Sequence, residues 1–107
     1  MPKKGGAPMT RLNITLQHCL PQEEALKRVR GLLGEELKNE ISNLQEEWRG
    51  NIGRFRCTAR GFPASGTITV KSSTVDLVAD VDLPFPISLL KGQIEQTIRK
   101  RAQTLLT

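Results

Sequence analysis

Aromatic residues are scarce in this chain of 107 residues, which has three phenylalanines, one tryptophan and no tyrosine. Hydrophobic residues nevertheless make up 37% of the sequence, near the share found in globular domains. The core must therefore be built mainly from aliphatic side chains. At this length, the chain is expected to bury one core rather than two.

Long apolar runs are also missing, and none approaches the roughly 18 residues that a membrane-spanning helix requires. Residues 1–9 are rich in glycine, proline and lysine and lack the apolar stretch of a secretory signal peptide. We therefore expect a cytoplasmic protein without a membrane span. Residues 1–9 are expected to form a disordered tail, and residues 10–107 a single α+β domain.

Reactive side chains are few, with two cysteines and one histidine in the chain. Neither cysteine belongs to a CxxC motif or a metal-ligating Cys/His cluster, so reduced thiols and no bound metal are expected. His18 and Cys19 are adjacent on an extended segment and point to opposite sides, which makes them a poor catalytic pair. No phosphate cradle, nucleophile elbow or zincin motif occurs in the sequence. The sequence thus predicts no catalytic residue, no cofactor and no enzyme activity.

The first half of the chain has a strand pattern followed by a helix pattern. Alternation over residues 11–17 places Leu12, Ile14 and Leu16 on one strand face. A helix is expected to begin at Pro21, which suits the first helical position. Its apolar stripe continues to residue 41 or 42 at spacings of three and four, with Ala25, Leu26, Val29, Leu32, Leu33, Leu37 and Ile41.

The second half alternates again over residues 54–60, 66–71 and 75–83, with turn residues between these segments. Trp48 is expected to open a further short strand before the turn at Gly50–Asn51. Pro84 and Pro86 are expected to end the last strand, and a second helical stripe follows from Ile87 to Leu105. The prediction is an α+β fold with an antiparallel sheet of four to five strands and two helices packed on one face, in the order β-α-β-β-β(-β)-α.

The open sheet face is the expected place for a partner, because Arg54, Arg56 and Arg60 share one parity along a strand. Arginine suits phosphate or carboxylate partners, and the net charge of +5 permits an anionic partner such as RNA. The alternative that we favour is a solvated ion-pair face, because three aspartates share a parity on a later strand: Asp76, Asp80 and Asp82. No aromatic side chain accompanies the arginines as a stacking platform, but duplex RNA could still be held by shape and phosphates.

Other single residues have simpler structural roles. His18 is expected to brace the turn between the first strand and the first helix, and Cys57 to be a small core residue. Trp48 either closes one end of the core or anchors a partner, and we favour the first role. Whether Cys19 is reactive stays open.

Short segments at both ends of the domain carry a diffuse family signature. The first has His18, Leu20 and the Glu23-Glu24-Ala25 run at the start of the first helix, and Gly66 follows in a late strand. The closing helix adds a Gly-x-Ile-Glu core, with Gly92, Ile94 and Glu95. In these positions the chain resembles the polyhydroxyalkanoic acid system protein family.

This resemblance implies an accessory or regulatory role near polyhydroxyalkanoate storage granules or their proteins, without polymerase or depolymerase activity. A granule offers apolar polymer, which the second helix could meet with Leu89, Leu105 and Leu106 if these side chains lie outside the core. The candidate partner-binding residues are therefore Arg54, Arg56, Arg60, His18, Leu89 and Lys91.

Three alternatives stay open. The order of strand, helix and meander, with a basic character, also looks like the ribosome-associated hibernation factors, which bind structured RNA, although the first helix is acidic for that role. A sheet with two helices can also enclose a modest apolar pocket for a small ligand. The open sheet face could instead pair with a second copy in a homodimer.

Overall fold

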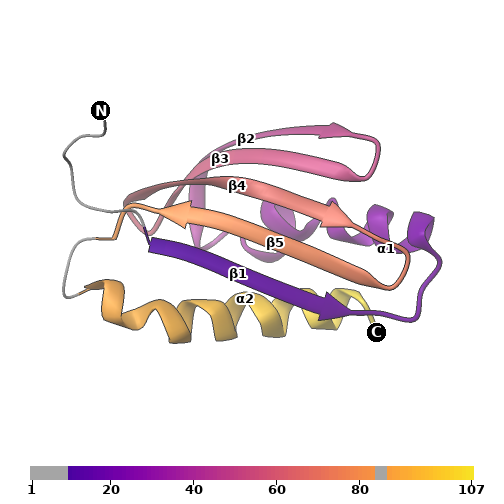
Figure 1. Ribbon diagram of the computed structural model, residues 1–107. Helices are drawn as coiled ribbons and strands as arrows, with labels where there is room; N and C mark the ends of the chain where they lie inside the picture. The colour runs from indigo at the N-terminus through magenta and orange to yellow at the C-terminus, as the bar shows by residue number, and fades with distance from the viewer. Residues whose placement is uncertain (1–9, 84–86) are drawn as a thin grey trace, which may run out of the picture.

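The computed structural model describes residues 10–83 and 87–107. In this part of the chain, five antiparallel strands form one sheet, and the helices lie together on one of its faces (Figure 1). The strands are β1 (Thr10–Gln17), β2 (Ile41–Arg49), β3 (Ile52–Ala59), β4 (Phe62–Val70) and β5 (Thr74–Val81). The predicted α+β class is confirmed. The predicted tail at residues 1–9, Pro84 and Pro86 lie outside the described residues.

The sheet has the order β1-β5-β4-β3-β2, so the first strand pairs with the last one and β2 lies at the far edge. β2 to β5 form a meander, and two-residue turns join β2 to β3 and β3 to β4. Alternation places one side of each strand against the helices. Leu12, Ile14 and Leu16 of β1 are almost fully buried there, as their spacing predicts.

The first helical region is shorter than predicted. Helix α1 spans Gln22–Val29, and a π-helical turn, η1, follows at Leu32–Glu36. Backbone bonds of i to i+5 spacing close this turn, for example from the Leu37 N–H to the Leu32 carbonyl at 2.9 Å. The apolar stripe is nevertheless buried from Ala25 to Leu37. The pattern therefore identified the core residues correctly but predicted one continuous α-helix where the structure has a short helix and a π-helical turn.

Strand β2 begins at Ile41, where the sequence predicted the end of a helix. A β-bulge hides its pattern, because Ser42 pairs with Thr58 and Gln45 pairs with Arg56, which leaves one extra residue on β2. Asn43 adopts a positive φ of 54° within the bulge. Trp48 does not open a strand but lies near the end of this nine-residue strand.

Helix α2 spans Lys91–Leu105, after a short 3₁₀ turn, η2, at Ile87–Leu90. Three of its side chains, four residues apart, bond to alternate residues on the free edge of β1. The Asn13 N–H donates to Glu95 at 3.3 Å, and Arg99 and Gln103 donate to the carbonyls of Thr15 and Gln17 at 3.0 and 3.4 Å. The spacing matches because four helical residues advance about 6.0 Å and two strand residues about 6.8 Å. The helix thereby covers this edge as well as the face.

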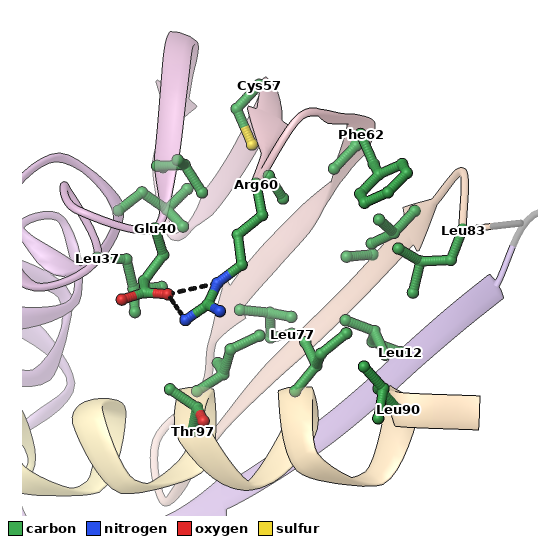
Figure 2. Close-up of a pocket in the computed structure, with 18 of the residues that line it drawn as sticks. Leu12, Leu37, Glu40, Cys57, Arg60, Phe62, Leu77, Leu83, Leu90 and Thr97 are labelled. Atoms are coloured by element: carbon green, nitrogen blue, oxygen red, sulfur yellow. Dashed lines mark hydrogen bonds and ion pairs between the residues drawn. The ribbon is translucent and has the colours of Figure 1, made fainter. Parts of the chain in front are cut away.

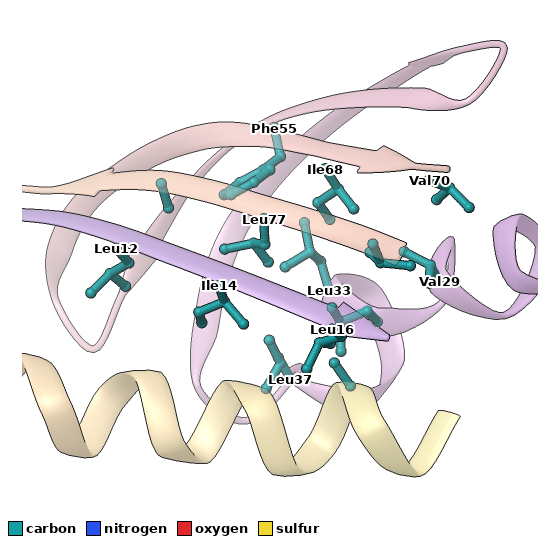
Figure 3. Packing of buried hydrophobic residues seen from close by; sticks show 14 of the residues in the cluster. Leu12, Ile14, Leu16, Val29, Leu33, Leu37, Phe55, Ile68, Val70 and Leu77 are labelled. Atoms are coloured by element: carbon teal, nitrogen blue, oxygen red, sulfur yellow. The ribbon is translucent and has the colours of Figure 1, made fainter. Parts of the chain in front are cut away.

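The core lies between the sheet and the helices, with β1, β4 and β5 contributing most of its buried side chains (Figure 3). Phe55 of β3 is 8% exposed, as its parity predicts. It faces Gly66 across the β3–β4 pair. Gly66 therefore lies in the middle of β4 rather than at its start. The Phe55 ring lies over the position where a side chain of residue 66 would begin.

Candidate functional site

The three arginines of the predicted basic face are not brought together. Arg54 and Arg56 point to the open face of the sheet, but Arg60 has left β3 and lies in the two-residue turn before β4. Arg60 and Gly61 have positive φ angles of 51° and 91°, which is the backbone of a type I′ turn. The turn breaks the strand parity, and the Arg60 side chain lines a pocket on the helix-covered side.

The predicted ion-pair face is also wrong in its partners, because β4 separates β3 from β5. Arg54 and Arg56 lie opposite Glu47 and Gln45 on β2, and neither forms an ion pair among the described residues. The two paired aspartates of β5 find partners elsewhere: Asp80 pairs with Arg11 at 3.0 Å and Asp76 with Lys71 at 2.8 Å.

These two ion pairs shift the pKa values of Asp76 and Arg11 on the open face. The hydrogen bond from Lys71 lowers the pKa of Asp76, with a smaller contribution from Thr15 across the strand pair. The hydrogen bond to Asp80 raises the pKa of Arg11. Both pairs are largely solvated, so they adjust local charge more than they stabilise the fold.

His18 braces the junction between β1 and α1, as predicted. Its side chain is 7% exposed and lies among backbone groups. Nδ1 accepts the Leu20 N–H at 3.2 Å, and Nε2 lies 3.1 Å from the Lys71 carbonyl. A carbonyl can only accept, so Nε2 carries the proton of a neutral imidazole. Both ring nitrogens are thus engaged in structural bonds, and Cys19 beside it is exposed.

Trp48 closes the β2 end of the core, in agreement with the favoured interpretation. Its ring lies on Gly53, where an added Cβ would be only 2.5 Å from the indole. The Arg30 guanidinium lies over the Trp48 ring, 5.6 Å from the ring centroid. This placement leaves the ring half-buried between the end of α1 and the sheet.

A cavity of about 350 Å³ lies between the sheet and α2 (Figure 2). Leu12, Leu77 and Leu83 lie on its sheet side, and Leu90 and Thr97 lie on its helix side. Most of the remaining lining is also apolar, with residues from η1, β2, β3, β4 and η2. This volume is at the lower end of the roughly 300–1,000 Å³ that small-molecule sites occupy.

The polar groups of the cavity are few: Glu40, Cys57, Arg60, Gln93 and Thr97. Arg60 donates through Nε and Nη2 to the same carboxylate oxygen of Glu40, the first bond at 2.7 Å. The Arg60 side chain is 73% exposed and that of Glu40 is 23% exposed, so the pair stands at the mouth of the cavity. Burial raises the pKa of the Cys57 thiol, which is therefore protonated at neutral pH.

Two leucines at the start of the closing helical region are exposed, and one of them, Leu90, also lines the cavity. Leu89 and Leu90 are 71% and 46% exposed, and Lys91 follows them at the start of α2. The other two leucines proposed for partner contact differ: Leu106 is 3% exposed and packs in the core, and Leu105 is half-buried. Only the N-terminal end of α2 therefore offers exposed leucines.

The sequence left open a modest apolar pocket but did not identify its lining residues, because they come from many elements. Glu40 precedes β2, Arg60 lies in a turn, and Gln93 and Thr97 lie four residues apart on α2. One signal was present: Gln93 and Thr97 interrupt the helical stripe on the side that carries Ile94 and Ile98. Within residues 10–83 and 87–107, no three potential metal ligands cluster, and no helix is long and apolar enough to cross a membrane.

Comparison with known proteins relates both the fold and the sequence to others. No curated protein matches the chain significantly. The crystal structure of TTHA0849 from Thermus thermophilus is similar over 90% of this chain and 91% of that one, with a TM-score of 0.57 and 19% identity, which shows a shared fold alone. The family model described as "Putative polyhydroxyalkanoic acid system protein (PHA_gran_rgn)" matches residues 12–106, nearly the whole described domain. The chain therefore belongs to the polyhydroxyalkanoic acid system protein family.

Proposed function

We propose that this protein is a non-enzymatic accessory or regulatory binding protein of the polyhydroxyalkanoate storage system. It acts in the cytoplasm, at the granule surface or on granule proteins. The observation that carries this proposal is an apolar cavity whose lining includes exposed Leu90, with exposed Leu89 next to it in the chain, in a protein of this family. Exposed leucine side chains next to an apolar cavity suit a hydrophobic partner.

The magnitude of the contact limits how binding can work. Complete burial of one leucine contributes roughly 1.5–3 kcal/mol, so covering the exposed parts of Leu89 and Leu90 supplies on the order of 2–3 kcal/mol. Association costs about 4–15 kcal/mol. The two leucines alone therefore give weak attachment, and the cavity or a granule protein must supply further contacts.

The chemistry of the reactive groups supports a binding role. Both ring nitrogens of His18 are engaged with backbone groups, so the imidazole has a structural role at the junction of β1 and α1. The Cys57 thiol lines the cavity, but its raised pKa keeps the thiolate scarce. Neither side chain is prepared to act as base or nucleophile.

Co-sedimentation tests the proposal with two preparations, protein-free polyhydroxyalkanoate particles and native granules, each from low to high salt. We expect the wild-type chain to pellet at every salt concentration, because apolar contact does not weaken as salt rises. The variant Leu89→Ser/Leu90→Ser should pellet several-fold less. Arg54→Ser/Arg56→Ser, on the opposite face, is the matched control and should pellet like the wild type.

Two results would contradict the proposal. A wild-type chain that stays in the supernatant with both preparations has no granule affinity. A chain that ignores polymer, but binds duplex RNA at low salt through Arg54 and Arg56, would instead have the RNA-binding function that the sequence left open.

A further inference from the structure

The cavity beneath α2 has an apolar interior and a polar mouth. A ligand that fits it should have an apolar part for the interior and polar groups for the mouth. Leucine, valine, isoleucine and phenylalanine side chains form most of its wall. If each heavy atom of a ligand takes roughly the 30 Å³ of a water molecule in the liquid, about 350 Å³ holds about twelve heavy atoms. That space suits one medium-length aliphatic chain and excludes a large planar ligand.

The mouth offers a donor and an acceptor side by side. Arg60 uses Nε and Nη2 on one oxygen of Glu40, which leaves Arg60 Nη1 and the second Glu40 oxygen without hydrogen bonds among the described residues. The Arg60 N–H also donates to the Glu40 carbonyl at 3.0 Å, which fixes the two residues relative to each other. A ligand that presents both an acceptor and a donor fits this pair.

The charge of the mouth distinguishes an acid from an ester. Arg60 and Glu40 neutralise each other, so a free carboxylate would bring a second negative charge beside Glu40. An uncharged ester places a carbonyl oxygen near Arg60 without that repulsion. A neighbouring hydroxyl can then donate to Glu40.

We propose that this cavity binds an uncharged hydroxyacyl ester, with its alkyl chain inside and its ester and hydroxyl groups at the Arg60–Glu40 pair. The assignment rests on the proposed function for the choice of hydroxyacyl chemistry, because the family is named for polymers of hydroxyalkanoic acids. Such an ester exists both as a free monomer and as the hydroxyl-terminal unit of a polymer chain, since every internal unit has its hydroxyl acylated. In that terminal unit, the alkyl side chain enters the cavity, and the ester and the free hydroxyl remain at the mouth.

Cys57 provides a reporter inside the cavity. The variant Cys19→Ser leaves Cys57 as the single thiol, since the chain has two cysteines. We expect an uncharged maleimide to label Cys57 slowly at mildly alkaline pH, where a larger fraction of the thiol is ionised. We expect the methyl ester of 3-hydroxyoctanoic acid, which is close to the size of the cavity, to slow labelling several-fold, and the free acid to protect several-fold less. Amide shifts of Gln93 and Thr97 in an NMR titration give a second readout of binding.

Variants at the mouth test its role. Arg60→Asn keeps a residue that tolerates positive φ, and Glu40→Gln removes only the charge. Each should weaken protection by the ester several-fold, while Arg56→Asn on the open face should not. Glu40→Gln should also improve binding of the free acid, because the repelling charge is gone.

Separate labelling experiments with polymer particles and with the methyl ester distinguish the two sources of the ligand. They also distinguish failure of ligand binding from failure of granule attachment. Protection by polymer particles carrying medium-length side chains identifies the hydroxyl-terminal unit of a polymer chain, and protection by the methyl ester alone identifies a free monomer. The inference is overturned if no ester protects Cys57 or shifts the two amides, or if the free acid binds more tightly than the ester. Labelling in the presence of the soluble methyl ester uses no particles, so in that arm granule attachment through Leu89 and Leu90 can fail or succeed independently.

Discussion

Gly66 in the middle of β4 tests how tightly the sheet is built. A Cβ at this position would be 2.1 Å from the Val78 carbonyl oxygen and 2.7 Å from the Ala79 Cα, both on β5. It would also be 3.0 Å from the Phe55 ring. Two of these neighbours are backbone atoms of the adjacent strand, so the β4–β5 pair must separate to accept an alanine.

The expected cost follows from which atoms can move. Overpacking a core costs typically about 1–3 kcal/mol, and we place Gly66→Ala at the upper end, about 3 kcal/mol, because backbone cannot swing aside as a side chain can. With a urea dependence of about 1.5 kcal/mol/M, this loss lowers the unfolding midpoint by about 2 M. Urea unfolding followed by Trp48 fluorescence measures it.

Two other glycines serve as matched controls. At Gly53 the added Cβ meets only the Trp48 ring, which is half-buried and can tilt, so Gly53→Ala should cost about 1 kcal/mol. At Gly92 of α2 nothing lies within 4 Å, so Gly92→Ala should stabilise by up to about 1 kcal/mol through helix propensity. If Gly66→Ala unfolds within about 1 kcal/mol of the wild type, the close β4–β5 approach is refuted.

Three further predictions concern polar contacts. His18→Ala should destabilise the fold by about 1–3 kcal/mol, measured by urea unfolding, because it leaves the Leu20 N–H and the Lys71 carbonyl without their partner. Glu95→Ala should speed hydrogen exchange at the Asn13 amide, which donates to Glu95, with little loss of global stability, and unchanged exchange there would show that the helix does not cover this edge. Because the pKa of Asp76 is lowered in the folded state, its contribution exists above the unfolded pKa and is lost as pH falls. The wild type should therefore lose more stability than Asp76→Asn on acidification below about pH 4, and parallel pH profiles would contradict this.

The sequence predicted the buried surface better than the elements that carry it. The stripe from Ala25 to Leu37 is buried, yet its second half forms a π-helical turn rather than α-helix. Spacings of three and four describe a face that turns toward the core, and a π turn preserves such a face. The start of β2 was placed at Trp48 instead of Ile41 for a different reason, since the bulge at Asn43 inserts one residue and breaks the period of two.

The family marks differ in how far the structure explains them. Gly66 is required because the β5 backbone leaves no space for a side chain, and Glu95 holds the free edge of β1 through Asn13. His18 joins the first strand to the turn between β4 and β5. Gly92 has open space around it, and nothing in the described structure explains it. Three of these marks therefore maintain the fold rather than carry chemistry.

The residues at the mouth of the cavity lie beside the β-bulge and in the tight turn, the two places where the structure departs from what the sequence patterns predict. Glu40 lies directly before the strand that carries the bulge, and Arg60 occupies the turn that breaks the parity of β3. The Arg60 N–H bonds to the Glu40 carbonyl, and Ile41 pairs with Ala59 beside them, so the end of the β2–β3 pair brings the two charges together. Regular strands would have left both side chains on fixed faces of the sheet, apart from each other. Because natural proteins depart from regular patterns mainly where function requires it, these departures are themselves a reason to look for a ligand at Arg60 and Glu40 rather than on the regular arginine face.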